Sequence, residues 1–186
     1  MINLDEYDFF WLTCEGTNES EAINWIIEEG RFIIPKNLYI TEFLRKLRSK
    51  SKREDFLDHE IVKYNIKKKV GIIYIHDSQN ENWNVSMRYQ EKMALKGIEV
   101  INVITRPEIE VLAIHSNSKW YSKWNKGTKS KPSDFLKPLV AFNIKQAGNF
   151  AKLFNNDFEL FVESCKKYKS SVTTKNAITI YDLITK

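Results

Sequence analysis

Cysteine, proline and glycine are scarce in this chain, which contains two, four and six of them among 186 residues. The two cysteines, Cys14 and Cys165, stand far apart, and neither belongs to a CxxC pair. This spacing supports neither a disulfide framework nor a zinc site, so we expect a reducing, cytoplasmic setting. The sequence also contains no internal repeat, no low-complexity segment and no credible linker.

Long apolar runs are absent as well. No stretch approaches the roughly 18 consecutive apolar residues that a membrane span needs, and the polar start Met1 to Glu6 lacks a signal-peptide pattern. We therefore expect a soluble protein without membrane contact. A length of 186 residues suits one domain with a sizeable core. The net charge of +5 is compatible with an anionic partner such as nucleic acid, although solubility alone would explain it.

The stretch from Asp8 to Thr17 organises the remainder of the chain. An apolar run that is typical of a buried strand ends abruptly at Glu15 and Gly16, and the residues after Thr17 follow a helical pattern. Glu15 is therefore predicted to lie at the carboxyl tip of a strand, where open α/β sheets gather ligands and catalytic groups. The alternative is that Glu15 only supports a turn or a helix cap.

A second apolar run, Val70 to Ile75, stops at His76 and Asp77. We expect a helix from 82 to 96, closed by a glycine, and a third strand from 98 to 104. In a parallel sheet of this kind the carboxylates of Glu15 and Asp77 would project from the same edge. Asp77 can equally serve as an Asx-turn residue, and His76 suits polar packing better than catalysis.

Two further acids follow the third strand. Pro107 suits the first turn of a helix, and Glu108 and Glu110 favour its positive end. Carboxylates from separate elements supply the oxygen ligands that Mg²⁺ prefers, and a metal held in this way can activate water to attack a phosphodiester. Glu110 can instead form an ordinary ion pair with Arg106. The predicted metal ligands are the four acids Glu15, Asp77, Glu108 and Glu110.

These motifs resemble the TOPRIM domains of topoisomerases and primases, and more closely their RloB-like branch. The stretch Cys14 to Glu19 resembles the strand-end glutamate and glycine of the first TOPRIM motif, and Ile73 to Gln79 occupies the place of the second. The segment from Arg106 to His115 resembles the acidic residue and apolar helix of the RloB-like proteins, and 176–183 resembles their closing Asn-Pro-x-Thr-like stretch. Gln79 departs from the pattern, since the family has an aspartate there, and Glu81 or Glu110 would have to compensate.

The resemblance implies a nuclease that depends on Mg²⁺ or Mn²⁺ and acts on DNA or RNA, as an effector of prokaryotic defence against phage. Glu15 would ligate metal or act as general base, Asp77 would be the principal ligand, and Glu110 or Glu108 would complete the catalytic pocket. A regulatory ATPase or another defence protein is an implied partner. The neutral Gln79 supports the alternative of a non-catalytic nucleic-acid-binding module with a degenerate metal site.

Cations cluster in the segment 41–53, which we expect to be a helix with an apolar face. The positive charges either complement the carboxyl end of that helix or contact phosphates. The predicted nucleic-acid contacts in the whole chain are Lys46, Arg48, Lys50, Arg53, Lys129 and Lys131. Trp120 and Trp124 suit a core-facing helix, with base stacking or docking of another protein as alternatives.

The sequence thus predicts a single α/β domain with a TOPRIM-like, Rossmann-like and mostly parallel central sheet flanked by helices. We expect the core to span about 5–115 and a helix-rich carboxyl-terminal part to span about 119–186. We also expect helical structure from 143 to 169.

Overall fold

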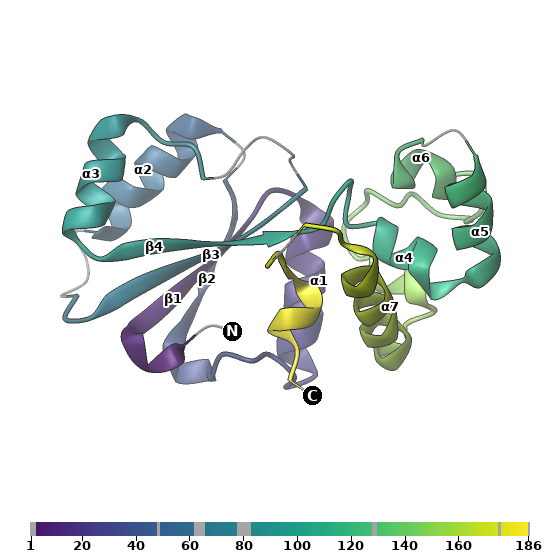
Figure 1. Cartoon of the computed structure of the whole chain (residues 1–186), viewed down its shortest axis with the longest axis horizontal. Helices are drawn as coiled ribbons and strands as arrows, with labels where there is room; N and C mark the ends of the chain where they lie inside the picture. Colours follow the sequence, from purple (N-terminus) through teal and green to yellow (C-terminus); the bar gives the residue numbers. More distant parts are fainter. Residues whose placement is uncertain are drawn as a thin grey trace.

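The chain forms an α/β fold in which helices flank a five-stranded, fully parallel sheet (Figure 1). A computed structural model describes residues 3–47, 49–61, 66–77, 83–127, 130–174 and 176–185, with the side chains of 41–46 and 61 left aside. The expected parallel sheet flanked by helices is confirmed, and the arrangement is consistent with a Rossmann-like fold.

The strands lie in the order β2-β1-β3-β4-β5. Their bounds are Tyr7–Cys14 for β1, Tyr39–Lys46 for β2, Lys69–His76 for β3, Ile98–Ile104 for β4 and Ile178–Thr179 for β5. The predictions of strands ending at Cys14, near His76 and at Ile104 are confirmed. Continuous runs of apolar residues marked them, because both faces of β1 and β3 are covered.

The prediction of a helix over 41–53 is wrong. Residues 41–46 belong to β2, which pairs in parallel with β1, and the helix α2 begins only at Lys50. β2 lies at the edge of the sheet, where a strand has a neighbour on one side only and needs less apolar character. The few apolar residues of this segment are spaced as on a helix face, and this spacing led to the wrong prediction.

The α-helices and short 3-10 helices complete the chain. The α-helices are α1 (Thr17–Glu28), α2 (Lys50–Ile61), α3 (Met87–Leu95), α4 (Val111–Ser116), α5 (Ser118–Lys126), α6 (Pro132–Leu136) and α7 (Phe158–Ser171). The 3-10 helices are η1 (Leu4–Glu6), η2 (Lys36–Leu38), η3 (Ala151–Phe154) and η4 (Ile180–Leu183). The helix expected from 82 to 96 is confirmed only over α3, because residues 83–86 are not helical, and Gly97 ends it with a positive φ of 64°.

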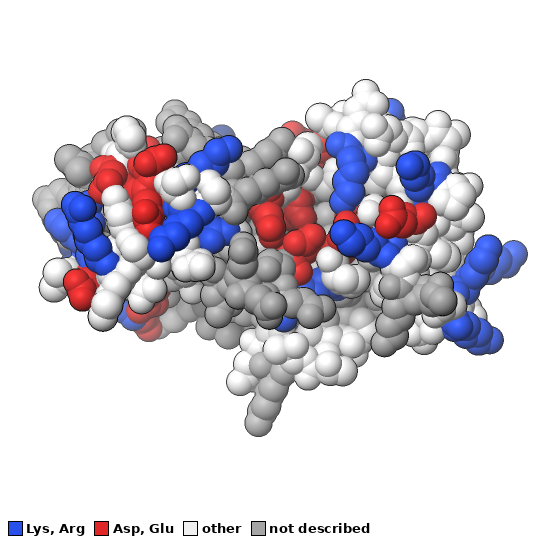
Figure 2. All heavy atoms as spheres, turned by 90° about the horizontal axis from the view of Figure 1, so that it is seen from above, with Lys and Arg blue, Asp and Glu red and all other residues white. Residues whose placement is uncertain are grey.

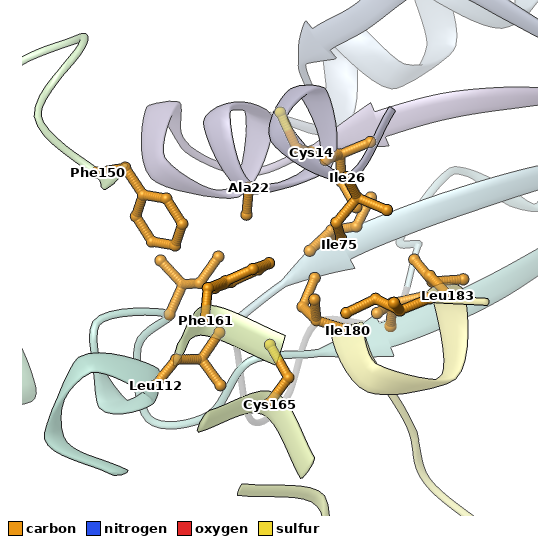
Figure 3. Packing of buried hydrophobic residues seen from close by; sticks show 14 of the residues in the cluster. Cys14, Ala22, Ile26, Ile75, Leu112, Phe150, Phe161, Cys165, Ile180 and Leu183 are labelled. Carbon is orange, nitrogen blue, oxygen red and sulfur yellow. The ribbon is translucent and has the colours of Figure 1, made fainter. Parts of the chain in front are cut away.

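Two apolar cores lie on opposite faces of the sheet. α2 and α3 cover one face, where Trp11, Leu57 and Tyr74 are fully buried, and α1, α4, α7 and η4 cover the other. Figure 3 shows the second core, in which Ala22 of α1, Ile75 of β3 and Phe161 of α7 converge. The carboxyl-terminal part is thus packed against the sheet rather than separate from it.

The helical structure expected over 143–169 forms only in η3 and α7, and residues 143–150 form turns instead. Asn155 and Asn156 both adopt a positive φ of 56°, which ends η3, and Asp157 then caps α7 by accepting a hydrogen bond from the amide of Leu160 at 3.0 Å. Among the described residues no helix combines the length and the apolar character that a bilayer span requires.

Candidate functional site: an acidic pocket at the end of the sheet

Glu15 and Asp77 follow β1 and β3, two adjacent strands in the middle of the sheet. The amide of Glu15 donates to the carbonyl of Ile75 at 2.9 Å, and the amide of Asp77 donates to Oε2 of Glu15 at 3.3 Å. The chain leaves β1 toward β2 on one side and continues through β3 on the other, so the gap between β1 and β3 is a topological switch point. Open α/β sheets bind ligands in such a gap.

Gly16 lets a third acid approach the same strand end. A Cβ atom at Gly16 would collide with the carboxylate of Glu19, so only glycine allows this carboxylate to lie against the turn before α1. Glu19 is 6% exposed, which is an unusual environment for a carboxylate. The sequence places Glu19 in the motif, but the structure adds it to the acids of the site.

Glu108 and Glu110 reach the pocket from the turn that precedes α4. Oε1 of Glu110, which is 1% exposed, accepts a hydrogen bond from Nδ2 of Asn18 at 2.7 Å. Nζ of Lys145 lies 2.7 Å from Glu110 and 3.4 Å from Glu108. The alternative role of Glu110, an ion pair with Arg106, is not seen between these two described residues: Glu110 pairs with Lys145, from a distant part of the chain.

These groups surround one cavity of about 300 Å³. Its lining includes Glu15, Glu19, Asp77, Glu110 and Lys145, so the structure brings three of the four predicted ligands to one place. The fourth, Glu108, forms an ion pair with Lys145, which lines the cavity. In the face shown in Figure 2, acidic side chains gather near the middle and basic side chains lie beside them.

Burial and mutual repulsion make two of the acids reluctant to ionise. Burial, reinforced by the charge of Glu15, raises the pKa of Asp77 to about 6. Burial, with further contributions from Glu110 and Asp77, raises the pKa of Glu19 to about 7. These two carboxyl groups therefore exchange protons near neutral pH.

Hydrogen-bond donors reverse the direction of the pKa shift at Glu108. Burial by itself raises the pKa of Glu108, but hydrogen bonds from Ser133 and the charge of Lys145 outweigh burial and lower it. Burial lowers the pKa of Lys145, whereas the hydrogen bond and charge of Glu110 raise it above its usual value. The pocket thus holds an ammonium ion beside Glu108 and Glu110, together with two acids, Asp77 and Glu19, whose pKa values are raised.

The pocket contains oxygen atoms that suit a further cation. Oε2 of Glu110 and Oδ1 of Asn18 are buried, and neither accepts a hydrogen bond from any described residue. Buried acceptors of this kind normally have a partner. No three described His, Cys, Asp or Glu side chains are grouped closely enough to hold one ion. Mg²⁺ commonly uses only one or two carboxylates and takes water or phosphate oxygens for its other positions, so the residues present fit that metal.

The predicted phosphate contacts are dispersed. Lys50 and Lys131 are exposed, and Lys131 precedes α6, whose Ser133 amide donates to Glu108 at 2.9 Å. Lys131 therefore lies near the acidic pocket. Arg48 and Lys129 fall outside the described residues, as do Gln79 and Glu81, and only the backbone of Lys46 is described.

Arg53 does not fit the predicted phosphate contact. It is 1% exposed and donates hydrogen bonds to the carbonyls of Leu47 and Asn84 and to the hydroxyl of Tyr74, at 3.0, 3.3 and 2.9 Å. Its guanidinium also lies 5.2 Å from the centre of the Tyr74 ring. The cation ties α2 to the sheet, so this part of the prediction is corrected.

Two tryptophans and one histidine take the packing roles that the sequence favours. Trp120 and Trp124 are half-buried on α5 against the core, and the indole N–H of Trp124 donates to the carbonyl of Ser130 at 3.0 Å. His76 is fully buried and stacks on Tyr74 with the ring centres 4.7 Å apart. Burial lowers the pKa of His76, so its imidazole is neutral at physiological pH.

Sequence reasoning missed Asn18 and Lys145 as members of the pocket. Both are joined to Glu110 across long stretches of chain, and nothing in the local pattern around Lys145 marks it as different from the other lysines. Comparisons with protein-family models, with curated proteins and with solved structures found no match to this chain.

Proposed function

We propose that this protein is a Mg²⁺-dependent nuclease that hydrolyses phosphodiester bonds at the acidic pocket. The observation that carries the proposal is the position of Glu15 and Asp77 at the ends of the adjacent strands β1 and β3, with the amide of Asp77 donating to Glu15. Both acids directly follow their strands, so the pairing of β1 with β3 places the two carboxylates next to each other.

The acids divide the roles in this proposal among metal binding, completion of the pocket and proton transfer. Asp77 and Glu15 would hold the metal, with Glu110 completing the pocket from the opposite side. A bound Mg²⁺ would supply Lewis-acid polarisation of the phosphate and an activated water. Glu19, with its pKa of about 7, is suited to hold or release a proton at neutral pH beside the reacting group.

The basic groups near the pocket suit an anionic substrate. Nζ of Lys145 faces the acids from one side, and its side chain is 55% exposed, so it is accessible to a phosphate that enters the cavity. The exposed Lys131 lies two residues before Ser133, whose amide donates to Glu108. These cations would orient the backbone of DNA or RNA and offset the negative charge that develops during attack.

We further propose, from the resemblance to the RloB-like branch of TOPRIM proteins, that the reaction serves prokaryotic antiviral defence. A partner ATPase that restrains the nuclease belongs to the same proposal. Recovery of one stoichiometric ATPase in a pull-down from the native host would support this setting. Recovery of the protein alone from phage-infected and uninfected cells would contradict it.

The experiment that tests the reaction uses labelled single-stranded and duplex DNA and RNA, with Mg²⁺ or Mn²⁺ and then with a chelator. We expect cleavage that the chelator abolishes. The substitutions Glu15→Gln and Asp77→Asn keep the shape of each side chain and remove its charge, so each should reduce cleavage by at least about 100-fold. Glu91→Gln, on the distant and exposed surface of α3, is the matched control and should leave cleavage unchanged.

A non-catalytic nucleic-acid-binding module is the second candidate function. The pairing of Lys145 with Glu110 and Glu108 favours it, because an internal cation already neutralises part of the acidic pocket. Binding of nucleic acid without cleavage, unchanged by the chelator, would support this candidate. Cleavage that survives both Glu15→Gln and Asp77→Asn would remove the assigned site.

A further inference from the structure

A second cavity, of about 590 Å³, lies between α4, α5 and α7. Its lining includes His115 of α4, Tyr121 of α5 and Lys166 and Lys167 of α7, together with three serines. The volume lies within the range of about 300 to 1,000 Å³ that is usual for small-molecule sites. None of these residues takes part in the acidic pocket.

His115 is the polar group at the base of this cavity. It is only 8% exposed, and within the described part of the chain neither of its ring nitrogens forms a hydrogen bond. Its ring contacts Tyr121 and Tyr168, with ring centres 4.7 and 5.8 Å apart. His115 lines the cavity, and its ring nitrogens are not among the buried polar atoms of the described residues that lack a partner, so they can exchange hydrogen bonds with a polar ligand that enters.

The chemistry of the cavity changes from its base to its rim. Burial lowers the pKa of His115 to about 4, so the imidazole is neutral and has one nitrogen able to donate a hydrogen bond and one able to accept. The Tyr121 ring provides an aromatic wall beside it. Lys166 and Lys167 are exposed at the rim, and Glu163 offsets part of their charge from a distance of 3.9 Å to Lys166.

We propose that this cavity binds a nucleotide unit, with the base against Tyr121 and His115 and the phosphate at Lys166 and Lys167. A neutral imidazole can hydrogen-bond the edge of a base, a phenol ring can stack on its face, and paired ammonium groups bind phosphate. A purely apolar ligand would leave His115 without a partner, and a simple inorganic anion would leave the aromatic wall unused.

The helix α4 joins this cavity to the acidic pocket. Glu110 directly precedes α4 and His115 lies near its end, a separation of one short helix of about 9 Å. The nucleotide unit is either a free mononucleotide or one unit of a nucleic-acid strand whose other part enters the acidic pocket. The assignment of this cavity does not depend on whether the acidic pocket cleaves anything.

The test measures binding in a chelator at low salt, so that no cleavage takes place. The probes are a fluorescent mononucleotide, N-methylanthraniloyl-AMP, and a fluorescein-labelled single-stranded oligoadenylate, with adenosine and inorganic phosphate as competitors. We expect unlabelled AMP to displace the first probe and adenosine or phosphate alone to displace it at least about tenfold less well. Binding of the mononucleotide indicates a free nucleotide, and binding of the oligonucleotide alone indicates a strand.

Two sets of variants locate the binding. The double substitution Lys166→Glu with Lys167→Glu should weaken binding of the probe by at least about tenfold, and His115→Leu should weaken it while the protein stays folded by circular dichroism. The matched control is Lys36→Glu with Lys96→Glu, which changes the net charge equally at exposed positions elsewhere. If His115→Leu fails to fold, the double lysine substitution alone tests the assignment.

Equal weakening by both lysine pairs would mean general charge attraction and would overturn the assignment. The absence of binding by both probes would overturn it as well. Weaker probe binding in the cavity variants, with unchanged probe binding in the control, supports the assignment whatever the outcome of the cleavage assay.

Discussion

At the scale of single residues, the sequence identifies acids at strand ends but not the groups that they meet. Glu15 and Asp77 are predictable because each ends an apolar run, and the order of strands then brings the two runs side by side. The partners of Glu110 are not predictable. Asn18 and Lys145 reach it through tertiary contacts between segments that carry no mutual signal in one sequence.

The raised pKa of Glu19 predicts a stability that depends on pH in the metal-free protein. The pKa rises from 4.5 to about 7, so the folded state keeps its proton where the unfolded state loses it, and stability falls as pH rises between these values. Glu19→Gln removes this penalty, which is on the order of 3 kcal/mol at most. Thermal unfolding should therefore place the variant above the parent protein at pH 8 and close to it at pH 4.

The exposed substitution Glu29→Gln is the control, and it should shift the midpoint equally at both pH values. A Glu19→Gln variant whose advantage is larger at pH 4 than at pH 8 would contradict the assigned ionisation.

Lys145 predicts a competition between an internal cation and a metal. Lys145→Met leaves the buried Glu110 without its ammonium partner, which we expect to cost about 1 to 2 kcal/mol because Lys145 is partly screened by solvent. Added Mg²⁺ should then raise the unfolding temperature more in this variant than in the parent protein, since a bound ligand stabilises the folded state. Lys145→Arg keeps the charge and should behave like the parent protein. An identical response of the unfolding temperature to Mg²⁺ in all three proteins would contradict a competition between Lys145 and the metal.

At the scale of elements, continuous apolar runs determine what the sequence reveals. β1 and β3 are covered on both faces and are recognisable, whereas the edge strand β2 resembles an amphipathic helix in its residue spacing. The wrong prediction of a helix over 41–53 also led to the wrong role for Arg53. On a solvent-exposed helix a cation would be free to contact phosphate. Arg53 is buried because α2 packs against the sheet, where the Arg53 side chain donates to the hydroxyl of Tyr74.

Arg53 predicts a structural role for the first turn of α2. Arg53→Met keeps much of the side-chain volume but leaves two carbonyls and the Tyr74 hydroxyl without their donor, so we expect a loss of about 2 to 4 kcal/mol in the free energy of unfolding. Lys52→Met, at an exposed neighbour on the same helix, should change stability by less than about 0.5 kcal/mol. Denaturant titration followed by circular dichroism measures both. A stable Arg53→Met variant with weakened nucleic-acid binding would restore the original phosphate assignment.

At the scale of the whole molecule, one core connects segments from both ends of the chain. Ile26 of α1, Ile75 of β3 and Phe161 of α7 are each 0% exposed and belong to the same cluster (Figure 3). A boundary near residue 116 would therefore cut through a packed interior, which supports the expectation of a single domain. The sequence suggested a core and a helix-rich extension, but only the packing indicates that the two parts stabilise each other.

This shared core predicts that the carboxyl-terminal part and the sheet unfold together. Phe161 packs edge-on against Phe154 and Phe150, so Phe161→Ala opens a cavity beside the sheet and should cost about 3 to 5 kcal/mol. Tryptophan fluorescence and far-ultraviolet circular dichroism should show one coincident transition in the parent protein, and both probes should shift equally in the variant. Phe158→Ala, at a half-buried neighbour on the same helix, should shift both probes by a smaller amount. Two separated transitions, of which only one responds to Phe161→Ala, would divide the chain into independent domains and contradict the core that the sheet shares with the carboxyl-terminal part.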